Sequence, residues 1–363
     1  MESMEIDNLI SAYKGKKVFL TGHTGFKGAW LSVVLNNIGS IIKGYSLEPE
    51  AKLSLYNLIK SNYSHESVIA DINDSDRLKK EIIKFQPDFI FHLAAQPLVR
   101  KSYREPLNTF NTNIIGTANL LNAVLSLENE CTIVTITTDK VYENREIDYA
   151  YKESDRLGGF DPYSSSKACA ELIINCYRQS FFNIENIDNH KKRLVSVRAG
   201  NVIGGGDWSE DRLIPDIIKS IELNNTIEIR NPYSIRPWQH VLEPVFGYLK
   251  LGALLSESPN KYSGAWNFGP SIKDNLPVIE IVKQAINVMG KGNYEIIKNH
   301  EEPHEAGLLK LNIEKALKEM NWQPLIDTHK AVELTMNWYK LFYEKKNTAY
   351  NLIQEDIHFI QSL

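Results

Sequence analysis

A glycine-rich turn near the N-terminus limits the possible folds of this chain more than any other feature. The run TGHTGFKG at residues 21–28 follows a short β-rich segment, Lys17–Thr21, and opens a helical pattern over residues 26–37. Glycine lets the backbone turn sharply and approach a pyrophosphate closely, and the free N–H groups of a helix N-terminus favour an anion. A tight turn without a ligand is the plainer interpretation, but the position after the first strand favours a nucleotide-binding α/β fold.

Strand-like and helical segments alternate through the first half of the chain. The β-rich runs lie at residues 41–46, 67–71, 88–93, 131–138 and 194–199, and helical patterns cover residues 75–85, 105–127 and 162–182. This alternation is typical of a parallel sheet covered by helices on both faces, so we expect a doubly wound, Rossmann-like α/β fold. The polar run 183–192 predicts a surface loop, and residues 345–363 predict a peripheral helix.

Beyond Gly200 the expected elements become shorter, and glycine, proline and tryptophan become denser. We therefore expect a dinucleotide-binding domain over residues 1–200 and a smaller C-terminal α/β substrate lobe over residues 201–363. Segments of the lobe are expected to interleave with the first domain. At 363 residues the chain is long enough for two such units around one cleft.

The composition excludes several classes of protein. A formal net charge of -4 provides no basic field of the kind that binds nucleic acid non-specifically. Cys131, Cys169 and Cys176 are odd in number and lack metal-type spacing, so we expect neither a disulfide framework nor a metal site. Neither a secretory signal pattern nor an apolar run of about 18 residues is found, and we expect a cytoplasmic protein with no membrane partner.

Tyr163 and Lys167 are the strongest candidates for catalysis. Their spacing of four places both side chains on one face of the predicted helix over residues 162–182. A lysine ammonium near a phenol stabilises the phenolate, which makes the tyrosine a usable proton acceptor. Most such pairs are ordinary surface pairs, but Thr138 ends a β-branched strand run at the edge where α/β proteins bind ligands. Together with the glycine turn, the three residues predict an active site.

These residues resemble a known family. The turn spacing G-x-x-G-x-x-G is similar to the short-chain dehydrogenase/reductase variant rather than to G-x-G-x-x-G, and Thr138, Tyr163 and Lys167 resemble that family's Ser/Thr-Tyr-Lys set. Asp139 and Lys140 follow Thr138, where extended members that are nucleotide-sugar 4,6-dehydratases usually carry Asp and Glu. The order Thr-Asp-Lys resembles the CDP-glucose branch of those dehydratases. The resemblance runs from about residue 16 to residue 343.

The resemblance implies an internal redox cycle that converts CDP-D-glucose to a 4-keto-6-deoxy sugar. Tyr163, assisted by Lys167, would take the C4 hydroxyl proton as hydride passes to NAD. Asp139 as acid and Lys140 as base would then remove water across C5 and C6, and the hydride would return to C6. An ammonium is a poor base, so Lys140 can act only if its surroundings lower its pKa. A place in deoxysugar biosynthesis, including that of lipopolysaccharide O-antigen, is also implied.

The resemblance implies a set of NAD contacts as well. They are Gly22, His23, Thr24, Gly25, Phe26, Lys27 and Gly28 in the turn, Ser46, Asp71, Ile72, Leu93, Ala94, Ala95, Gln96 and Asn113, together with Tyr163 and Lys167. Ser46 stands where NAD enzymes usually carry an acidic residue, and no arginine lies nearby to favour NADP, so this strand tip leaves NAD and NADP open. His23 and Lys27 could touch the pyrophosphate or point to solvent.

Substrate contacts are implied for five residues of the second lobe. They are Asn201 at the sugar phosphate, and Arg212, Arg236, Trp238 and His240 at the nucleotide. Arginine suits phosphate because its planar fork donates paired hydrogen bonds, although either arginine could be a surface ion-pair partner. Residues 304–306 and 315–324 resemble the family's closing segment. Members commonly pair through two long helices, so a homodimer through residues 105–127 and 162–182 is implied.

Three other functions stay open at this point. A nucleotide-sugar 4-epimerase would share the glycine turn, Tyr163 and Lys167, but would not need Asp139 with a second proton-transfer group beside it. A 4,6-dehydratase for another nucleotide sugar would share every catalytic residue. A non-catalytic dinucleotide-binding protein could lose Tyr163 and Lys167, and their presence with Thr138 argues against that class.

Overall fold

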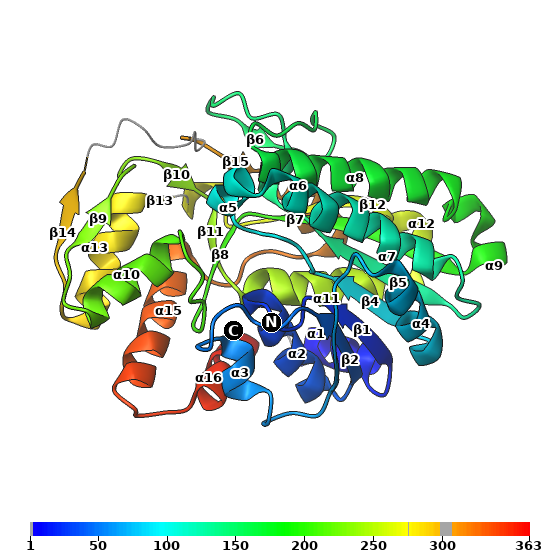
Figure 1. Cartoon of the computed structure of the whole chain (residues 1–363), viewed down its shortest axis with the longest axis horizontal. Coiled ribbons are helices and arrows are strands. Elements are labelled where there is room, and N and C mark those ends of the chain that lie inside the picture. The colour runs from blue at the N-terminus through cyan, green and yellow to red at the C-terminus, as the bar shows by residue number, and fades with distance from the viewer. Residues whose placement is uncertain (1–2, 275, 298–306) are drawn as a thin grey trace.

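Seven parallel strands form the central sheet of the computed structural model, which describes residues 3–274, 276–297 and 307–363 (Figure 1). Across the sheet they are β12 (Gly264–Phe268), β7 (Lys192–Ala199), β5 (Cys131–Ile136), β4 (Phe89–His92), β1 (Lys17–Thr21), β2 (Ile41–Ser46) and β3 (Glu66–Ile69). The chain leaves β1 for β2 and β3 on one side, then crosses to β4, β5 and β7 on the other. This reversal confirms the doubly wound, Rossmann-like fold, and folds of this kind bind ligands in a crevice outside the carboxyl ends of the strands at the reversal, here β1 and β4.

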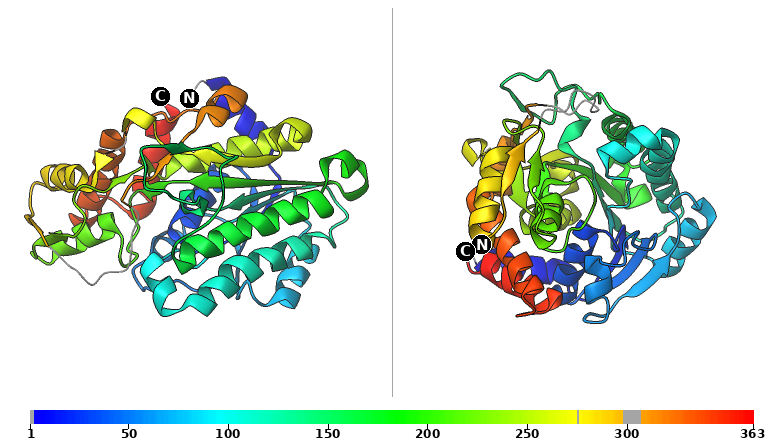
Figure 2. Two further views of the ribbon diagram at one scale, coloured as in Figure 1. Left: turned by 90° about the horizontal axis from the view of Figure 1, so that it is seen from above. Right: turned by 60° about the vertical axis from the view of Figure 1, so that its left-hand side comes forward.

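Helices cover both faces of this sheet (Figure 2). One face carries α1 (Ser3–Tyr13), α2 (Phe26–Ile38) and α11 (Leu242–Glu257), and the other carries α4 (Ser75–Phe85), α7 (Gly116–Val124) and α8 (Pro162–Ser180). Ile133 and Val134, neighbours in β5, belong to the two separate cores on either side. A central parallel strand is therefore buried on both faces, which explains why its sequence is a continuous apolar and β-branched run.

The helix predicted over residues 105–127 is interrupted. It consists of α6 (Pro106–Phe110), a π-helical turn η1 (Asn111–Ile115) and α7. The wider turn directs Asn113 inward, where its amide donates to the Ser166 hydroxyl at 2.8 Å and accepts from the Gln96 backbone at 2.8 Å. Single π turns inside helices are common at functional sites, and nothing in the helical apolar spacing distinguishes this one.

Segments from beyond residue 200 contribute to the central sheet and the helices on it as well as to the predicted second lobe. Strand β12 belongs to the seven-stranded sheet, and α11 covers one of its faces. Helices α10 (Leu213–Glu222), α13 (Val278–Met289) and α15 (Thr328–Tyr343) belong to the predicted second lobe. The division at residue 200 stays a prediction. The predicted C-terminal helix is present as α16 (Ala349–Gln361), and it packs against α2 and α3 (Leu55–Ile59) with buried apolar side chains.

Two details of the outer chain differ from the predictions. The polar run predicted as a surface loop forms a 3-10 turn, Ile184–Asn186, and a short helix α9, Ile187–His190. Helix α1 was not predicted, because its short polar sequence carries a weak pattern. Residues 304–306 lie outside the described residues. Within the described part of the chain, no helix combines the length and apolar character that crossing a membrane requires.

The remaining elements are short. They are α5 (Val99–Arg104), η2 (Asp139–Val141), β6 (Ala150–Tyr151), β8 (Asn201–Ile203), β9 (Ile227–Ile229), β10 (Ile235–Arg236), β11 (Trp238–His240), α12 (Pro259–Tyr262), η4 (Ile272–Asp274), β13 (Leu276–Pro277), β14 (Tyr294–Ile296), β15 (Lys310–Leu311) and α14 (Glu314–Met320). Small two-stranded sheets pair β8 with β11, β9 with β14, β10 with β13 and β6 with β15. The two ends of the chain lie close together (Figures 1 and 2).

Candidate active site

The glycine turn is packed too closely at the carboxyl end of β1 to hold side chains at Gly22 and Gly28. Gly22 has a φ of 76°, and a Cβ there would lie 2.7 Å from the Ala94 nitrogen. A Cβ at Gly28 would meet the Gly22 carbonyl oxygen at 2.1 Å. Gly25 caps α2 without any side-chain hydrogen bond, so the first N–H groups of this helix are not capped by the residue that precedes it. This is the backbone arrangement that an anionic pyrophosphate requires.

His23, in the middle of the turn, does not face the ligand crevice. Its imidazole is fully buried, hydrogen-bonds Ser67 Oγ at 2.8 Å and packs so closely on Gly44 that a Cβ there would lie 2.3 Å from the ring. Burial lowers the pKa of His23 to about 3, with a smaller contribution from His65. The side chain therefore neither touches a pyrophosphate nor points to solvent, which corrects the prediction and leaves only the backbone of His23 for the cofactor.

Lys27, four residues later, turns towards the catalytic residues. Its Nζ donates to Tyr248 Oη at 3.2 Å and lies 5.5 Å from the centre of that ring. Burial, with smaller contributions from the positive charges of Arg212 and Lys167, lowers the pKa of Lys27 to about 7, and the Asp139 charge opposes the shift. Lys27 is thus not a solvated surface lysine, and it belongs electrostatically to the site around Lys167.

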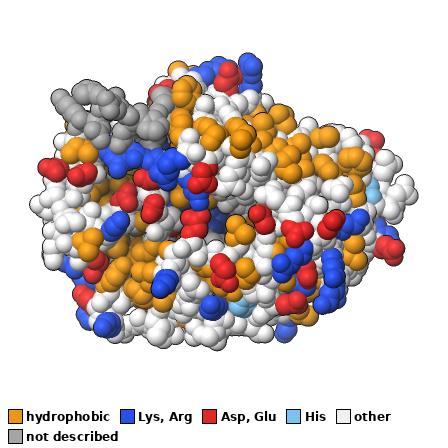
Figure 3. Space-filling model, viewed as in Figure 1, with side chains coloured by type: hydrophobic (Ala, Val, Ile, Leu, Met, Phe, Trp, Pro, Cys, Tyr) orange, Lys and Arg blue, Asp and Glu red, His pale blue; other side chains and the backbone are white. Residues whose placement is uncertain are grey.

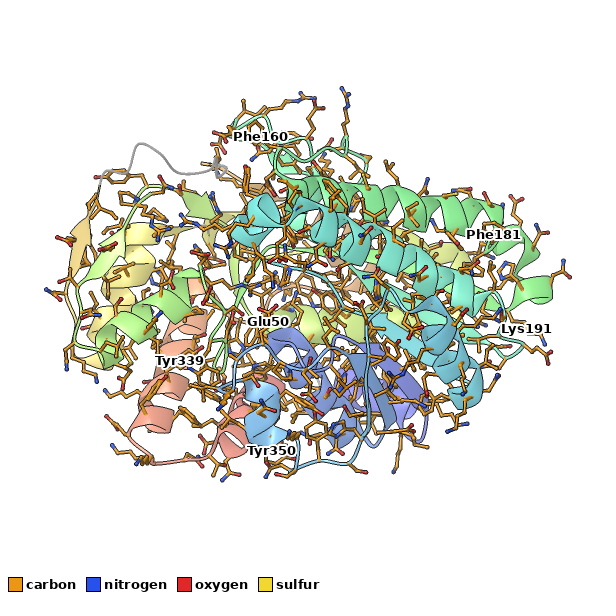
Figure 4. The ribbon with its side chains drawn as sticks, viewed as in Figure 1. Glu50, Phe160, Phe181, Lys191, Tyr339 and Tyr350 are labelled. Atoms are coloured by element: carbon orange, nitrogen blue, oxygen red, sulfur yellow. The ribbon has the colours of Figure 1, made fainter. Side chains whose placement is uncertain are left out.

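The catalytic helix α8 begins beside the tip of β5. Asp161 caps it by accepting a hydrogen bond from the Ser164 nitrogen at 2.9 Å, which fixes the first turn that carries Tyr163. Lys167, one turn on, is buried, and its Nζ donates to the Ile136 carbonyl at 3.2 Å. Phe160 and Phe181 mark the two ends of this helix in Figure 4. The structure therefore brings Tyr163 and Lys167 to the end of β5, as the spacing predicts.

Thr138 links the tyrosine to the aspartate. Burial raises the pKa of Tyr163 to about 12, and a hydrogen bond with Thr138 opposes that shift. The Thr138 hydroxyl also donates to Asp139 Oδ1 at 2.8 Å. Asp139 is 1% exposed, and its Oδ2 has no hydrogen-bond partner among the described residues. Burial raises the pKa of Asp139 and the Lys140 charge opposes it, so this carboxyl is suited to give a proton.

The predicted loop beneath the cofactor is tied to the π turn. The backbone nitrogens of Leu93 and Ala94 donate to Thr21 Oγ1 at 3.1 and 3.2 Å, and the Gln96 nitrogen donates to Asn113. Ala95 is half-buried between them. The loop, the π turn and α8 therefore form one connected floor beside the glycine turn.

Residues predicted at the adenosine end lie along the tips of β2 and β3. Ser46 and Thr24 share a hydrogen bond of 2.8 Å, which joins the second strand to the glycine turn. Asp71 accepts from the Asn73 nitrogen at 2.9 Å, and Ile72 packs under Gly116. These residues border the same crevice from its other side, and Phe26 is half-buried at the start of α2, in contact range of Gly204.

The five predicted substrate residues do not all reach the site. The Arg212 charge acts on Lys27 and Tyr163, and the buried Arg236 acts on Asp139, so both cations approach the catalytic residues from the second lobe. Asn201 is half-buried at the start of β8. These three side chains can meet an anionic substrate.

Trp238 and His240 lie in the core instead. Trp238 is 5% exposed, and His240 is fully buried edge-on against Trp30, 5.7 Å between ring centres. Burial lowers the pKa of His240 to about 3, and its Nε2 lies 3.7 Å from Asp356 Oδ2 of α16. The fully buried imidazole has no surface to offer a nucleotide sugar, which corrects the prediction for His240. Trp238 and His240 are two positions apart in one short strand and face the same side, and sequence does not show whether that side is core or solvent.

The match to known proteins agrees with this geometry. The family model described as GDP-mannose 4,6 dehydratase matches residues 19–335. The chain belongs to the GDP-mannose 4,6 dehydratase family. It is 47% identical over 328 residues to the CDP-glucose 4,6-dehydratase of Salmonella typhimurium, which covers 90% of this chain and 91% of that protein. It is 25% identical over 339 residues to the UDP-glucose 4-epimerase of Mycoplasma genitalium, with 86% and 95% covered.

Solved structures give the same architecture. The dTDP-glucose 4,6-dehydratase of Bacillus anthracis, in complex with NAD, has a TM-score of 0.74 and 21% identity, covering 91% of this chain and 98% of that one. An epimerase from Methanothermobacter thermautotrophicus has a TM-score of 0.78 and 21% identity, covering 97% and 98%. At these identities the likeness establishes the fold.

In this member of the GDP-mannose 4,6 dehydratase family, the sequence interpretation missed a buried network behind α8. Glu171 and Arg198 form an ion pair of 2.9 Å, with side chains 3% and 4% exposed. Arg198 also donates to Tyr142 Oη at 2.9 Å, and Tyr142 donates to Asn267 at 2.7 Å. A signal existed for Glu171, which follows Lys167 at helical spacing. None existed for Asn267, because it comes from β12, far along the chain.

Proposed function

We propose that this chain is an NAD-dependent CDP-glucose 4,6-dehydratase, a hydro-lyase that converts CDP-D-glucose to CDP-4-keto-6-deoxy-D-glucose and water. The observation that carries the proposal is the buried Asp139, with one carboxylate oxygen bound by Thr138 and the other without a partner among the described residues. An enzyme that only oxidises and reduces C4 has no use for a second buried acid next to the tyrosine. The 47% identity to a CDP-glucose 4,6-dehydratase supports the substrate.

The crevice around the glycine turn fits a dinucleotide. Gly22 and Gly28 leave no room for a Cβ, and α2 presents its N-terminus to the space beside them. Bound there, NAD would supply the acceptor for the C4 hydride and the donor that returns it to C6. The structure of a dTDP-glucose 4,6-dehydratase with NAD supports the same cofactor here, rather than NADP. The polar tip at Ser46 offers no cation for a 2'-phosphate.

Tyr163 accepts the C4 hydroxyl proton when its phenolate is stabilised. Its raised pKa means that the phenolate needs help from neighbouring cations, and Arg212 lowers the pKa in this site. Lys167 lies one turn away, and burial lowers the pKa of its ammonium to about 8. Both cations therefore favour the charged form of the tyrosine during C4 oxidation.

Asp139 and Lys140 serve the loss of water. Once C4 is a ketone, the C5 hydrogen is acidic, and a base is needed on that side of the ring. We assign that role to the neutral amine of Lys140, which is half-buried beside Asp139, while the protonated Asp139 gives its proton to the departing C6 oxygen. Lys140 returns its proton to C5 when hydride adds to C6, so the net change is one proton gained by Tyr163 and one lost by Asp139, and Thr138 hydrogen-bonds both groups.

Arg212, Arg236 and Asn201 hold the diphosphate and sugar. Arg212 is a third exposed and pairs with Asp207 at 3.1 Å, so its guanidinium is held by a carboxylate and still reaches solvent. A diphosphate offers oxygens that match the guanidinium fork. The fully buried His240 offers no surface to the substrate, and a substrate contact at Trp238 stays a prediction.

Turnover of a panel of nucleotide sugars tests the function. Purified protein with NAD is incubated with CDP-glucose, dTDP-glucose, UDP-glucose or GDP-mannose, and the products are analysed by mass spectrometry. We expect loss of water from CDP-glucose, and no product from the Tyr163→Phe variant. Loss of water from another sugar alone would change the substrate, C4 inversion without dehydration would make the protein an epimerase, and full activity of Tyr163→Phe would overturn the mechanism.

We also propose a homodimer that pairs through the α6–α7 segment and α8. Figure 3 shows hydrophobic side chains gathered over these helices, and the exposed apolar residues there are Leu107, Ile115, Leu125, Leu172 and Phe181. A homodimer would bury this surface. Sedimentation analysis is expected to give a dimer for the wild type and a monomer for Leu172→Glu; a wild-type monomer would contradict it.

The three thiols carry no disulfide, which supports the expected cytoplasmic location.

A further inference from the structure

Glu171 lies on α8 one helical turn after Lys167, so the two side chains share one face of the helix. Its carboxylate accepts from Thr137 Oγ1 at 2.5 Å, from Ser196 Oγ at 2.8 Å and from Arg198 Nη2 at 2.9 Å. Burial raises the pKa of this carboxyl, but the Arg198 charge and the hydrogen bonds lower it below its ordinary value. Glu171 is therefore a fixed negative charge inside the protein.

Lys167 needs such a charge. Burial favours the neutral amine and is the larger effect, so the pKa of Lys167 is lowered to about 8 even though the Glu171 charge opposes the shift. The other titratable groups whose charges act with Lys167 are Lys27 on α2 and the buried His92 on β4, and neither carries a negative charge. Tyr163 lies one turn earlier on the same helix, and Asp139 on η2 is hydrogen-bonded by Thr138.

The same carboxylate ties α8 to the segments that hold the acid. Thr137 immediately precedes Thr138, so its hydrogen bond to Glu171 fixes the tip of β5 against the helix. Arg198 extends the link, because its Nη1 donates to Tyr142 Oη, just beyond the turn that carries Asp139. Through buried groups, the network thus connects the helix that carries Tyr163 and Lys167 to the segments on either side of Asp139.

We propose that Glu171 is a positioning residue that keeps Lys167 in its cationic form and holds the tip of β5 in register with Tyr163. This inference rests on the proposed function, because Lys167 matters only if Tyr163 works as a proton acceptor. Glu171 itself touches no reacting atom. It acts through Lys167, one helical turn away, and through Thr137, which donates a hydrogen bond to it.

The ionisation of Lys167 tests the charge directly. The variant Glu171→Gln keeps the shape of the side chain but removes its charge, so the ammonium of Lys167 loses the anion that favours it. We expect the pKa of Lys167 to fall by about one pH unit, the lower end of what one nearby opposite charge contributes. NMR titration of 13Cε-labelled lysine in the full chain measures it, with the signal identified from Lys167→Arg.

The pH profile of turnover gives a second readout. Activity that needs the Lys167 ammonium is present below its pKa and is lost as pH rises through it, so the alkaline limb of kcat for CDP-glucose should move to lower pH in Glu171→Gln. KM should stay close to the wild-type value, because Glu171 does not touch the substrate. A merely structural role would lower kcat equally at every pH.

Two further variants separate charge from folding. Glu153→Gln is the matched control: Glu153 also lies close to Arg198 and accepts from the Asn267 nitrogen at 2.9 Å, but it does not act on Lys167. It should leave the pKa of Lys167 unchanged. If Glu171→Gln fails to fold because Arg198 loses its partner, the double variant Glu171→Gln, Arg198→Met removes both buried charges and should still show the lowered pKa.

An unchanged Lys167 pKa in a folded Glu171→Gln or double variant would overturn the inference, and so would an equal change in Glu153→Gln. Because the titration needs no substrate, a wild-type protein that fails to turn over CDP-glucose would reject the proposed function and leave the measurement of Lys167 intact. The two failures are therefore distinguishable.

Discussion

Two buried carboxylates, Glu171 and Asp139, lie near the carboxyl end of β5 and have opposite surroundings. Glu171, beneath α8, accepts from two hydroxyls and a guanidinium, and its pKa lies below the ordinary value although burial raises it. Asp139, beyond the end of β5, accepts a side-chain hydrogen bond on one oxygen only, and burial raises its pKa. The first carboxylate is held ionised, and the second is poised to keep a proton.

The contrast shows how burial alone fails to distinguish a structural acid from a chemical one. Both side chains are almost inaccessible, so the number of donors facing each carboxylate decides which form is stable. A carboxylate whose oxygens all accept hydrogen bonds stays ionised and has no proton to donate. A carboxyl with one oxygen that accepts no hydrogen bond can serve a substrate. We therefore expect mutations at Asp139 to affect chemistry and mutations at Glu171 to affect stability and the charge of Lys167.

The largest expected effect is on turnover. Asp139→Asn should lower kcat by about 10²- to 10⁴-fold, because the acid for the C6 oxygen is lost. An amide keeps the acceptor for Thr138 and carries no charge to bury, so the thermal midpoint at neutral pH should not fall. Stopped-flow assays with CDP-glucose and differential scanning calorimetry measure the two quantities. An Asp139→Asn variant with a much lower thermal midpoint but wild-type kcat would show that Asp139 serves stability rather than chemistry.

Glu171→Ala should cost stability instead. Removing the carboxylate leaves the Arg198 guanidinium buried without its partner, and such losses cost about 3–5 kcal/mol. Urea unfolding followed by circular dichroism measures this difference. The matched change Glu153→Ala should cost clearly less, since Glu153 is only partly buried; equal losses would show that Arg198 does not depend on Glu171.

The pH dependence of stability should have opposite signs at the two sites. Asp139 has a raised pKa in the folded state, so ionising it takes stability away as pH rises from its ordinary value of 3.8 through the folded pKa. The loss is about 1.4 kcal/mol for each pH unit that separates the folded and unfolded pKa values. Glu171 has a lowered pKa, so its stabilisation is present above 4.5 and is lost as pH falls through its folded pKa.

Urea unfolding between pH 4 and pH 7 checks both signs. Asp139→Asn should be more stable than the wild type at the upper end, and this advantage should shrink towards the lower end. The deficit of Glu171→Gln should instead persist down to about pH 4.5 and shrink below it. Parallel curves for the two variants would contradict the assignment of opposite pKa changes.

The smallest expected effect concerns one donor of the Glu171 network. Thr137→Val removes the hydroxyl that binds Glu171 but keeps the β-branched shape, so it should cost about 1 kcal/mol, the usual net contribution of one hydrogen bond. Thermal unfolding measures it. A loss as large as that of Glu171→Ala would mean that Thr137, rather than Arg198, holds the carboxylate.

The local sequence pattern was enough to predict most strands of the sheet. The bounds predicted for β1, β2 and α4 match the structure, because alternating apolar runs and helical spacing are properties of neighbouring residues. The interruption of the helix at Asn111–Ile115 was not visible, since a π turn changes backbone hydrogen bonding without a distinctive apolar pattern. The strand β12 was missed because its pairing with β7 joins segments far apart in the chain.

The sequence by itself determined the order of strand, glycine turn and helix and the one-turn spacing of Tyr163 and Lys167, because each depends only on residues within a few positions of one another. Only the tertiary structure decided that His23 turns into the core while Lys27 turns to the catalytic residues, although both belong to one turn. It also decided that the pKa of Glu171 is lowered and that of Asp139 is raised. Those outcomes depend on burial and on donors that arrive from distant strands, and no local pattern contains them.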